Sequence, residues 1–161
     1  MAVVTDPLTS LSEDHQRILG ILEEVRRGIG VLSNNKASAA DLAALRKAAQ
    51  TLAHELDLHS MKKEEEGLFP PLAEAIGPVG PIAVMLADHR EVENHLPKLL
   101  AELSKDKPDA ARARSHADVI WGLLPGHIQK EDYILYPMAR QRLTRQQMDR
   151  VTAKFQELNK G

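Results

Sequence analysis

The sequence predicts an all-α protein, an up-down-up-down four-helix bundle with a short additional C-terminal helix. The composition is rich in helix-favouring Ala, Leu, Glu, Lys, Arg and Gln, and only 3% of the residues are aromatic. Four long segments repeat apolar side chains at steps of three and four residues, the period of a helix buried on one face. Breaks rich in Gly, Pro and Asn separate these segments. The 161 residues, 43% of them hydrophobic, fit a single domain over 1–161.

The overall charge and the amino acids that are missing narrow the class of function. A formal net charge of −2, without a basic run between aromatic residues, argues against nucleic acid or an anionic membrane as a partner. The chain has no cysteine, which excludes disulfides, thiolate metal sites, iron–sulfur clusters and cysteine nucleophiles. No signal peptide and no membrane span of about 20 apolar residues are recognisable. We therefore expect a cytoplasmic protein.

The first helix is expected to follow an extended lead-in over residues 1–9 and to open a bundle over residues 10–139. Ser10 and Glu13 form a capping-box pattern, which places the start of the helix near them. The apolar positions that follow are Leu11, Ile18, Leu22, Val25, Ile29 and Leu32. The steps of three and four are complete only when His15 is included, so His15 is predicted to lie on the buried face.

The second helix is predicted to begin at Ser38, which is followed three residues later by Asp41. Its buried face carries Leu42, Leu45, Ala49, Leu52 and Leu56. His59 takes the next position on that face. A histidine thus again occupies a position that the pattern reserves for an apolar residue.

Beyond His59 the pattern slips by one residue. Glu64 lies five residues after His59, and on an ideal α-helix this separation turns the two side chains roughly 140° apart. A single-turn π-bulge absorbs one residue, and such bulges gather at functional sites. We therefore predict a π-bulge between Leu58 and Glu64. The dipeptide Pro70-Pro71 is expected to end or sharply bend the helix.

The third helix is predicted to start at Pro81, after the loop formed by residues 77–81. Its buried face carries Ile82, Met85, Val92, Leu96, Leu99 and Leu103. His89 fits into this face without any slip. Pro97 removes a backbone hydrogen bond inside the helix and is expected to kink it.

The fourth helix is predicted to begin near Asp109 and to carry both His127 and Glu131 on its buried face. Because these two residues are four apart, their side chains lie one above the other on a helix. Pro125 precedes His127 and predicts a bend or bulge just before it. A last helix over residues 144–158 is predicted to pack against the end of the bundle.

Two stretches of the chain repeat each other. The segment from His127 to Pro137 resembles the segment from His59 to Pro70 when the two are aligned at their ends. The matching pairs are Lys63 with Lys130, Glu64 with Glu131, Leu68 with Leu135, and Pro70 with Pro137. Two helices that each bring a histidine and a carboxylate to one core predict a metal site inside the bundle.

The predicted interior therefore holds four histidines and two carboxylates. A buried carboxylate is costly unless it is paired or bound to a metal, and here only protonated histidines would otherwise balance the charge. Imidazole and carboxylate ligands suit iron or manganese and also admit zinc. The predicted metal ligands are His15, His59, Glu64, His89, His127 and Glu131.

The pattern resembles the hemerythrin-like family, the histidine–histidine–glutamate cation-binding domains. The resemblance covers most of the chain, from Asp14 to Met138. It is carried by Asp14-His15, by His59 with Lys-Glu-Glu-Glu-Gly-Leu-Phe-Pro, by Asp88-His89, and by His127-x-x-x-Glu131 followed by Leu-Tyr-Pro-Met-Ala. It implies a four-helix bundle around a non-haem di-iron centre.

The resemblance also implies a range of functions. Members of this family bind oxygen reversibly, sense oxygen or redox state, or handle iron, nitric oxide or peroxide. We accordingly expect two iron ions as the cofactor, with manganese or zinc as alternatives. The expected ligand is dioxygen, another small diatomic molecule or peroxide, and any partner protein is unidentified. A binding or sensing protein is favoured, and a di-metal peroxidase or catalase-like enzyme is the alternative.

Two departures from the family pattern leave ligands open. The family spacing on the second helix is four, whereas His59 and Glu64 are five apart, which leaves open either His59 as a ligand or the choice of Glu64 over Glu65. Hemerythrins proper place two histidine ligands on the third helix, whereas this chain offers His89 alone. Glu93, one turn after His89, could complete one ion, and water would otherwise fill the place.

Other polar residues near the pattern are expected to have lesser roles. His116 lies on the fourth buried face, but about 16 Å from His127 along a helix, so it is too far away to share the site. His54 and His95 fall off the buried faces and are expected to be exposed. Tyr133 is a candidate hydrogen-bond donor to the site, whereas Tyr136 is expected to pack the core.

Overall fold

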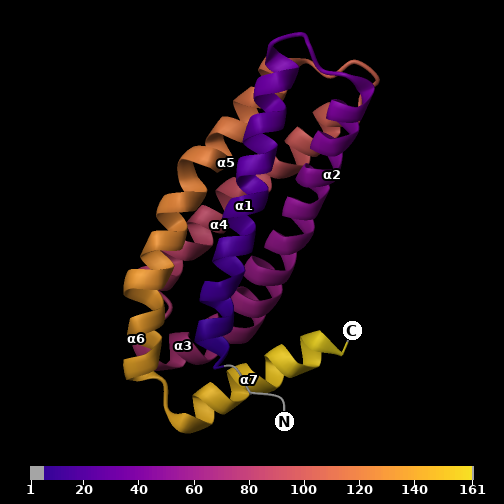
Figure 1. Cartoon of the computed structure of the whole chain (residues 1–161). Coiled ribbons are helices and arrows are strands. Elements are labelled where there is room, and N and C mark those ends of the chain that lie inside the picture. The colour runs from indigo at the N-terminus through magenta and orange to yellow at the C-terminus, as the bar shows by residue number, and fades with distance from the viewer. Residues whose placement is uncertain (1–5, 161) are drawn as a thin grey trace.

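The computed structural model describes residues 6–160, and within them the chain is entirely helical. The helices are α1 (Pro7–Ser33), α2 (Ala39–Leu56), α3 (Phe69–Ile76), α4 (Pro81–Leu103), α5 (Ala110–Lys130), α6 (Tyr136–Arg142) and α7 (Arg145–Asn159), with π-helical segments η1 (Asp57–Leu68) and η2 (Glu131–Leu135). The segment η1 joins α2 to α3, and η2 joins α5 to α6, without a break. Figure 1 shows α1, α2, α4 and α5 side by side, running alternately up and down, as the sequence predicts.

The first helix begins earlier than the sequence predicts. Asp6 is the N-cap of α1, its carboxylate accepts a hydrogen bond from the Thr9 backbone N–H, and Pro7 occupies the first helical turn. The expected capping box at Ser10 is therefore wrong, and the expected extended lead-in is wrong for residues 7–9. An aspartate followed by a proline starts the helix because proline needs no hydrogen-bond acceptor there. Residues 1–5 of the lead-in lie outside the described part of the chain.

The other helix starts agree with the predictions. Ser38 and Asp41 form a complete capping box at the start of α2. Asp109 caps α5, and Pro81 opens α4. Thr144 caps α7 by a capping box with Gln147, and this helix lies across the end of the bundle near α3 and α6 (Figure 1). Pro70 and Pro71 do not end the helix, since both lie in the first turn of α3, which continues to Ile76.

The apolar core consists of two clusters, and both α1 and α4 pass from one cluster to the other at the predicted histidine. In α1, Leu11 belongs to one cluster and Ile18 to the other, and His15 lies between them in the sequence. In α4 the same change occurs between Met85 and Val92. A polar layer thus crosses the bundle between two apolar layers, so water is kept from it on both sides along the bundle axis.

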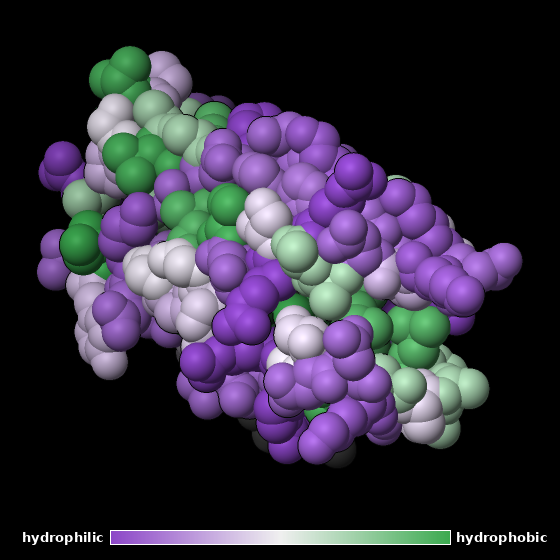
Figure 2. Space-filling model, turned by 90° about the horizontal axis from the view of Figure 1, so that it is seen from above, coloured by the Kyte–Doolittle hydropathy of each residue, from purple (hydrophilic) through white to green (hydrophobic). Residues whose placement is uncertain are grey.

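The outer surface is mostly polar. Seen from above, hydrophilic side chains cover most of the molecule and apolar side chains show in smaller patches between them (Figure 2). Within residues 6–160, no helix combines the length and the apolar character that crossing a membrane requires. These observations agree with a helical bundle whose apolar residues face inward.

Two glycines of α1 provide a test of how closely α1 and α2 pack. A Cβ atom at Gly28 would lie 2.8 Å from Leu45 Cδ1 and 3.2 Å from Leu45 Cβ, whereas one at Gly20 would have no neighbour within 4 Å. We expect Gly20→Ala to raise the free energy of unfolding by about 0.5–1 kcal/mol, because alanine loses less backbone entropy in a helix. Gly28→Ala should not be stabilised in this way, because its new Cβ atom would displace the buried Leu45. Denaturant unfolding of both variants measures the difference in their free energies of unfolding. Equal stabilisation by both substitutions would contradict the close packing.

Candidate metal centre

The six predicted ligands meet in the polar layer. Two groups of side chains have nitrogen and oxygen atoms close enough to hold a metal ion: within each group, the potential ligand atoms all lie within 4.8 Å of one another. One group is His15, His59 and Glu131, and the other is Glu64, His89, His127 and Glu131. All six residues are buried, and Glu131 belongs to both groups.

In the first group, the Nε2 atom of His15 lies at the centre. It is 3.2 Å from the Nε2 atom of His59 and 3.1 Å from Oε1 of Glu131. The Nε2 atom of His59 is 3.8 Å from the same Glu131 oxygen. Two imidazole nitrogens and one carboxylate oxygen therefore converge from three different helical segments.

In the second group, each imidazole faces a carboxylate. Nε2 of His89 is 3.2 Å from Oε1 of Glu64, and Nε2 of His127 is 3.3 Å from Oε1 of Glu131. Oε1 of Glu64 is also 3.6 Å from Nε2 of His59, a member of the first group. Each of the two glutamates therefore lies close to histidines of both groups.

The π-helical segments make this convergence possible. In η1, the Phe69 N–H donates to the carbonyl of Glu64, five residues earlier, and the extra residue per turn brings His59 and Glu64 to one side. The predicted π-bulge is thereby confirmed. Pro70 follows at once and has no N–H, so the π-type ladder cannot extend further.

The fourth helix has its distortion in a different place from the predicted one. Helix α5 continues through Pro125 to Lys130, and the π-helical segment η2 begins only at Glu131. The Tyr136 N–H donates to the carbonyl of Glu131, and Pro137 follows, as in the first repeat. Of the bend or bulge predicted before His127, the bulge is not found there, because His127 and Glu131, four apart, both precede the inserted residue.

Every histidine of the site is oriented by a carboxylate on its other ring nitrogen. The Nδ1 pairs are His15 with Asp132 at 2.9 Å, His59 with Asp14 at 3.0 Å, His89 with Glu65 at 2.7 Å, and His127 with Asp88 at 2.9 Å. A carboxylate on Nδ1 fixes the tautomer in which Nε2 carries a free lone pair, and it makes the ring a better metal ligand. All four Nε2 atoms are therefore set to face the interior as ligands.

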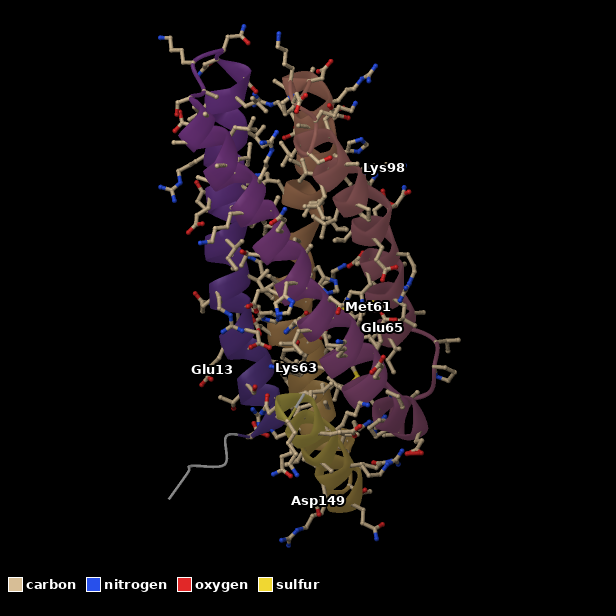
Figure 3. All side chains as sticks on the ribbon, turned by 90° about the vertical axis from the view of Figure 1, so that its right-hand side faces the viewer. Glu13, Met61, Lys63, Glu65, Lys98 and Asp149 are labelled. Atoms are coloured by element: carbon tan, nitrogen blue, oxygen red, sulfur yellow. The ribbon has the colours of Figure 1, made fainter. Side chains whose placement is uncertain are left out.

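The orienting carboxylates are themselves held by cations. Lys63 donates to Asp14 at 2.9 Å and Lys130 donates to Asp88 at 2.8 Å, so the repeated lysines have matching roles. Glu65 is held by Arg90 of α4. Lys63 lies toward α1 and Glu65 toward α4, on either side of η1 (Figure 3). These ion pairs extend the site from the interior to the surface.

Tyr136 is a site residue that the sequence reasoning missed. Its hydroxyl donates to Oε2 of Glu64 at 2.8 Å and lies 3.4 Å from Nε2 of His15. The alternative donor, Tyr133, is 79% exposed and faces away. The repeat contained the signal, because Tyr136 aligns with Phe69 before the shared proline, and a hydroxyl in that apolar position needs a partner.

The structure also shows where the alternative ligands Glu65 and Glu93 and the remaining histidines lie. Glu65 orients His89 from outside the two groups, and Glu93 is exposed and paired with Arg90 at 2.7 Å. His54 is exposed, as expected. His95 is half-buried rather than exposed, because its Nδ1 atom lies 3.0 Å from Nδ1 of His116 on the neighbouring helix.

The buried charges shift one another's protonation in the metal-free protein. Burial alone would lower the pKa of His59, but the charge of Glu64 and contacts with Asp14 and Glu131 raise it to about 10. Burial would likewise lower the pKa of His127, but the hydrogen bond and the charge of Glu131 outweigh it and raise this pKa to about 9. Burial and the charge of Glu131 raise the pKa of Glu64 to about 7. Both histidines are therefore protonated at neutral pH until a stronger cation replaces their protons.

Comparison with known proteins agrees with this geometry. A protein-family model described as "Hemerythrin HHE cation binding domain" matches residues 6–139. No curated protein and no solved structure gave a significant match. The matched residues contain all six side chains of the two groups.

The raised pKa values predict that metal binding releases protons. A ligating imidazole must be neutral, so an ion that binds at pH 7 has to displace the protons of His59 and His127. The release should shrink as the pH rises through about 9 and 10, the pKa values of His127 and His59. The apparent affinity should rise with pH up to this range and level off above it. Calorimetric titration with Zn²⁺ in two buffers of different ionisation enthalpy measures the released protons. Heats that are independent of the buffer at pH 7 would contradict this account.

Proposed function

Because this chain belongs to the hemerythrin HHE cation-binding family, we propose that it holds two iron ions and binds dioxygen or another small ligand at them. Binding or sensing of the ligand is the function that the site supports best. The family match and the buried histidine–glutamate groups support cation binding. The choice of iron and of the ligand rests on the chemistry of the donor atoms.

One observation carries the proposal. Four buried polar atoms of the described chain make no hydrogen bond of good geometry, and all four belong to the two groups: Glu64 Oε1, His89 Nε2, His127 Nε2 and Glu131 Oε2. Two of the histidine nitrogens only approach a carboxylate, His89 Nε2 at 3.2 Å from Glu64 Oε1 and His127 Nε2 at 3.3 Å from Glu131 Oε1. An unpartnered buried polar atom costs about 1–3 kcal/mol, and more when it is charged. Bound cations would satisfy these atoms together, since each oxygen, and each imidazole nitrogen once its proton is displaced, offers a lone pair to the same interior space.

The donor set fits two ions with shared carboxylates. His15, His59 and Glu131 would hold one ion, and His89, His127, Glu64 and Glu131 would hold the other. A carboxylate has two oxygens, so Glu131, which belongs to both groups, would help to hold both ions. Imidazole and carboxylate ligands without any thiolate favour iron or manganese over softer metals.

The surrounding residues prepare the site for a redox-active metal. When bound, ferrous iron would supply the electrons that a small oxidising ligand such as dioxygen accepts. The two apolar clusters exclude bulk water, and the carboxylates on Nδ1 hold the imidazoles in place. The Tyr136 hydroxyl donates to Glu64 and keeps that carboxylate oriented. Burial together with nearby carboxylates raises the pKa of Tyr136, so the hydroxyl remains a neutral donor.

Iron content tests the proposal directly. After anaerobic loading with ferrous iron and gel filtration, the protein should retain two iron ions per chain, and its absorption spectrum should change on admission of air. His127→Ala should lose most of the bound iron, because removal of a metal ligand weakens the site steeply. His54→Ala is the matched control, since His54 is exposed and lies outside both groups. Retention of less than one ion by the unmodified protein would refute the proposal.

A further inference from the structure

A cavity lies between α1 and α5, away from the candidate metal centre. It has a volume of about 170 Å³, and its lining extends from these two neighbouring helices (Figure 1) to Leu52 of α2 and Leu99 of α4. A Cβ atom at Gly30, which also lines it, would have no neighbour within 4 Å, so there is open space at this residue. The lining includes none of the six candidate metal ligands, and the cavity is therefore separate from the polar layer.

We propose that this cavity binds a small organic acid, a molecule with one carboxylate and an apolar body of about six carbon atoms. The apolar body lies between the four helices, and the carboxylate lies at the mouth of the cavity. This second ligand site goes beyond the function proposed above and does not depend on it, because no residue of the lining is needed to hold a metal ion.

The inner walls of the cavity are apolar and come from all four long helices. The most deeply buried lining residues, each at most 4% exposed, are Leu22, Val25, Ile29, Leu52, Leu99 and Ile120. Their side chains offer no hydrogen bond to water, so an apolar group is favoured there. An engineered cavity of about 150 Å³ with similar walls in another protein binds benzene. The size of the present cavity therefore suits an apolar body of about six carbon atoms.

The mouth of the cavity carries a net positive charge. Arg26 of α1 and Arg114 of α5 line the cavity together with one acidic residue, Asp118. All three residues are exposed, whereas the apolar walls are buried, so the charged groups lie at the outer end. Two guanidinium groups against one carboxylate favour an anionic head group over a neutral or a cationic one.

Both arginines keep donors available for a ligand. Nη1 of Arg26 is 3.9 Å from Oε2 of Glu23, and Nε of Arg114 is 3.8 Å from Oδ2 of Asp118. These distances are longer than a hydrogen bond. Cζ of Arg26 lies 4.3 Å from the centroid of the Trp121 ring, and such stacking leaves the in-plane N–H groups of the guanidinium accessible. A carboxylate at the mouth can therefore accept charge-assisted hydrogen bonds.

Trp121 gives a direct measurement of binding. It is the single tryptophan of the chain and it lines the cavity, so its fluorescence should change when the cavity of the full chain is filled. Hexanoate, 1-hexanol and hexylammonium share a six-carbon chain and differ in the charge of the head group. Hexanoate should bind at least about threefold more tightly than 1-hexanol, and hexylammonium most weakly, because an ion pair at an exposed mouth contributes modestly. Without recognition of the charge, 1-hexanol would bind more tightly than hexanoate, since it is less strongly hydrated.

Two pairs of variants test the two ends of the site. Arg114→Gln should weaken binding of hexanoate and leave that of 1-hexanol unchanged, whereas Arg27→Gln, at an exposed arginine outside the lining, should change neither. Ala117→Phe places a ring at a buried lining position and should abolish binding of both probes. Ala111→Phe is its matched control, since Ala111 lies on the same helix but is exposed and outside the lining.

Three results would overturn the inference. Tighter binding of 1-hexanol than of hexanoate would show that the mouth does not recognise a carboxylate. Hexanoate binding that Ala117→Phe leaves unchanged would place the acid elsewhere on the protein. Should Ala117→Phe not fold, the double variant Arg26→Gln/Arg114→Gln changes only exposed side chains, and an unchanged affinity for hexanoate in it would equally contradict the site. Calorimetry measures this last affinity, because loss of the Arg26 stacking alters the fluorescence of Trp121 by itself.

Discussion

The burial of Glu64 and Glu131 is the constraint on which the rest of the structure depends. Two carboxylates, both inaccessible to solvent, cannot remain charged in an apolar core without compensation. The four imidazoles around them supply it when they are protonated, and a bound metal ion would supply it when they are neutral ligands. Each imidazole in turn needs a fixed orientation, and a carboxylate on its Nδ1 atom provides it. The polar layer is therefore a network in which the buried glutamates need the imidazoles beside them, and the imidazoles need the carboxylates that lie farther out.

This network follows the internal repeat of the chain. Asp14-His15 on α1 corresponds to Asp88-His89 on α4, and Lys63 and Lys130 hold the two aspartates in the same way. His15 in turn bonds Asp132 beside Glu131, and His89 bonds Glu65 beside Glu64. The two halves of the bundle thus orient each other's histidines. The repeat also explains the two π-helical segments, because each ends just before the proline of its own repeat.

Much of this arrangement was predictable from periodicity, because a buried helix face shows directly which histidines replace apolar residues. The π-bulge after His59 was predictable because a five-residue spacing cannot otherwise bring His59 and Glu64 together. The equivalent bulge after Glu131 left no such mark, since no ligand follows it, although both glutamates precede their proline by the same six residues. The orienting carboxylates were not predictable as such, because their partners lie on other helices and only the packing angle decides which one each imidazole meets.

The difference between Phe69 and Tyr136 shows how a symmetric framework gives two unlike groups of buried histidines and glutamates. Both rings stack on a histidine in nearly the same way: Phe69 on His89 with planes 13° apart, and Tyr136 on His15 with planes 12° apart. Only the tyrosine adds a hydroxyl, which satisfies Oε2 of Glu64, whereas Oε2 of Glu131 is left without a hydrogen-bond partner. Because the rings pack alike, this single oxygen adds a polar contact beside His15 that the His89 side lacks. The asymmetry of the centre therefore arises from one polar atom, placed where the repeat otherwise demands an apolar ring.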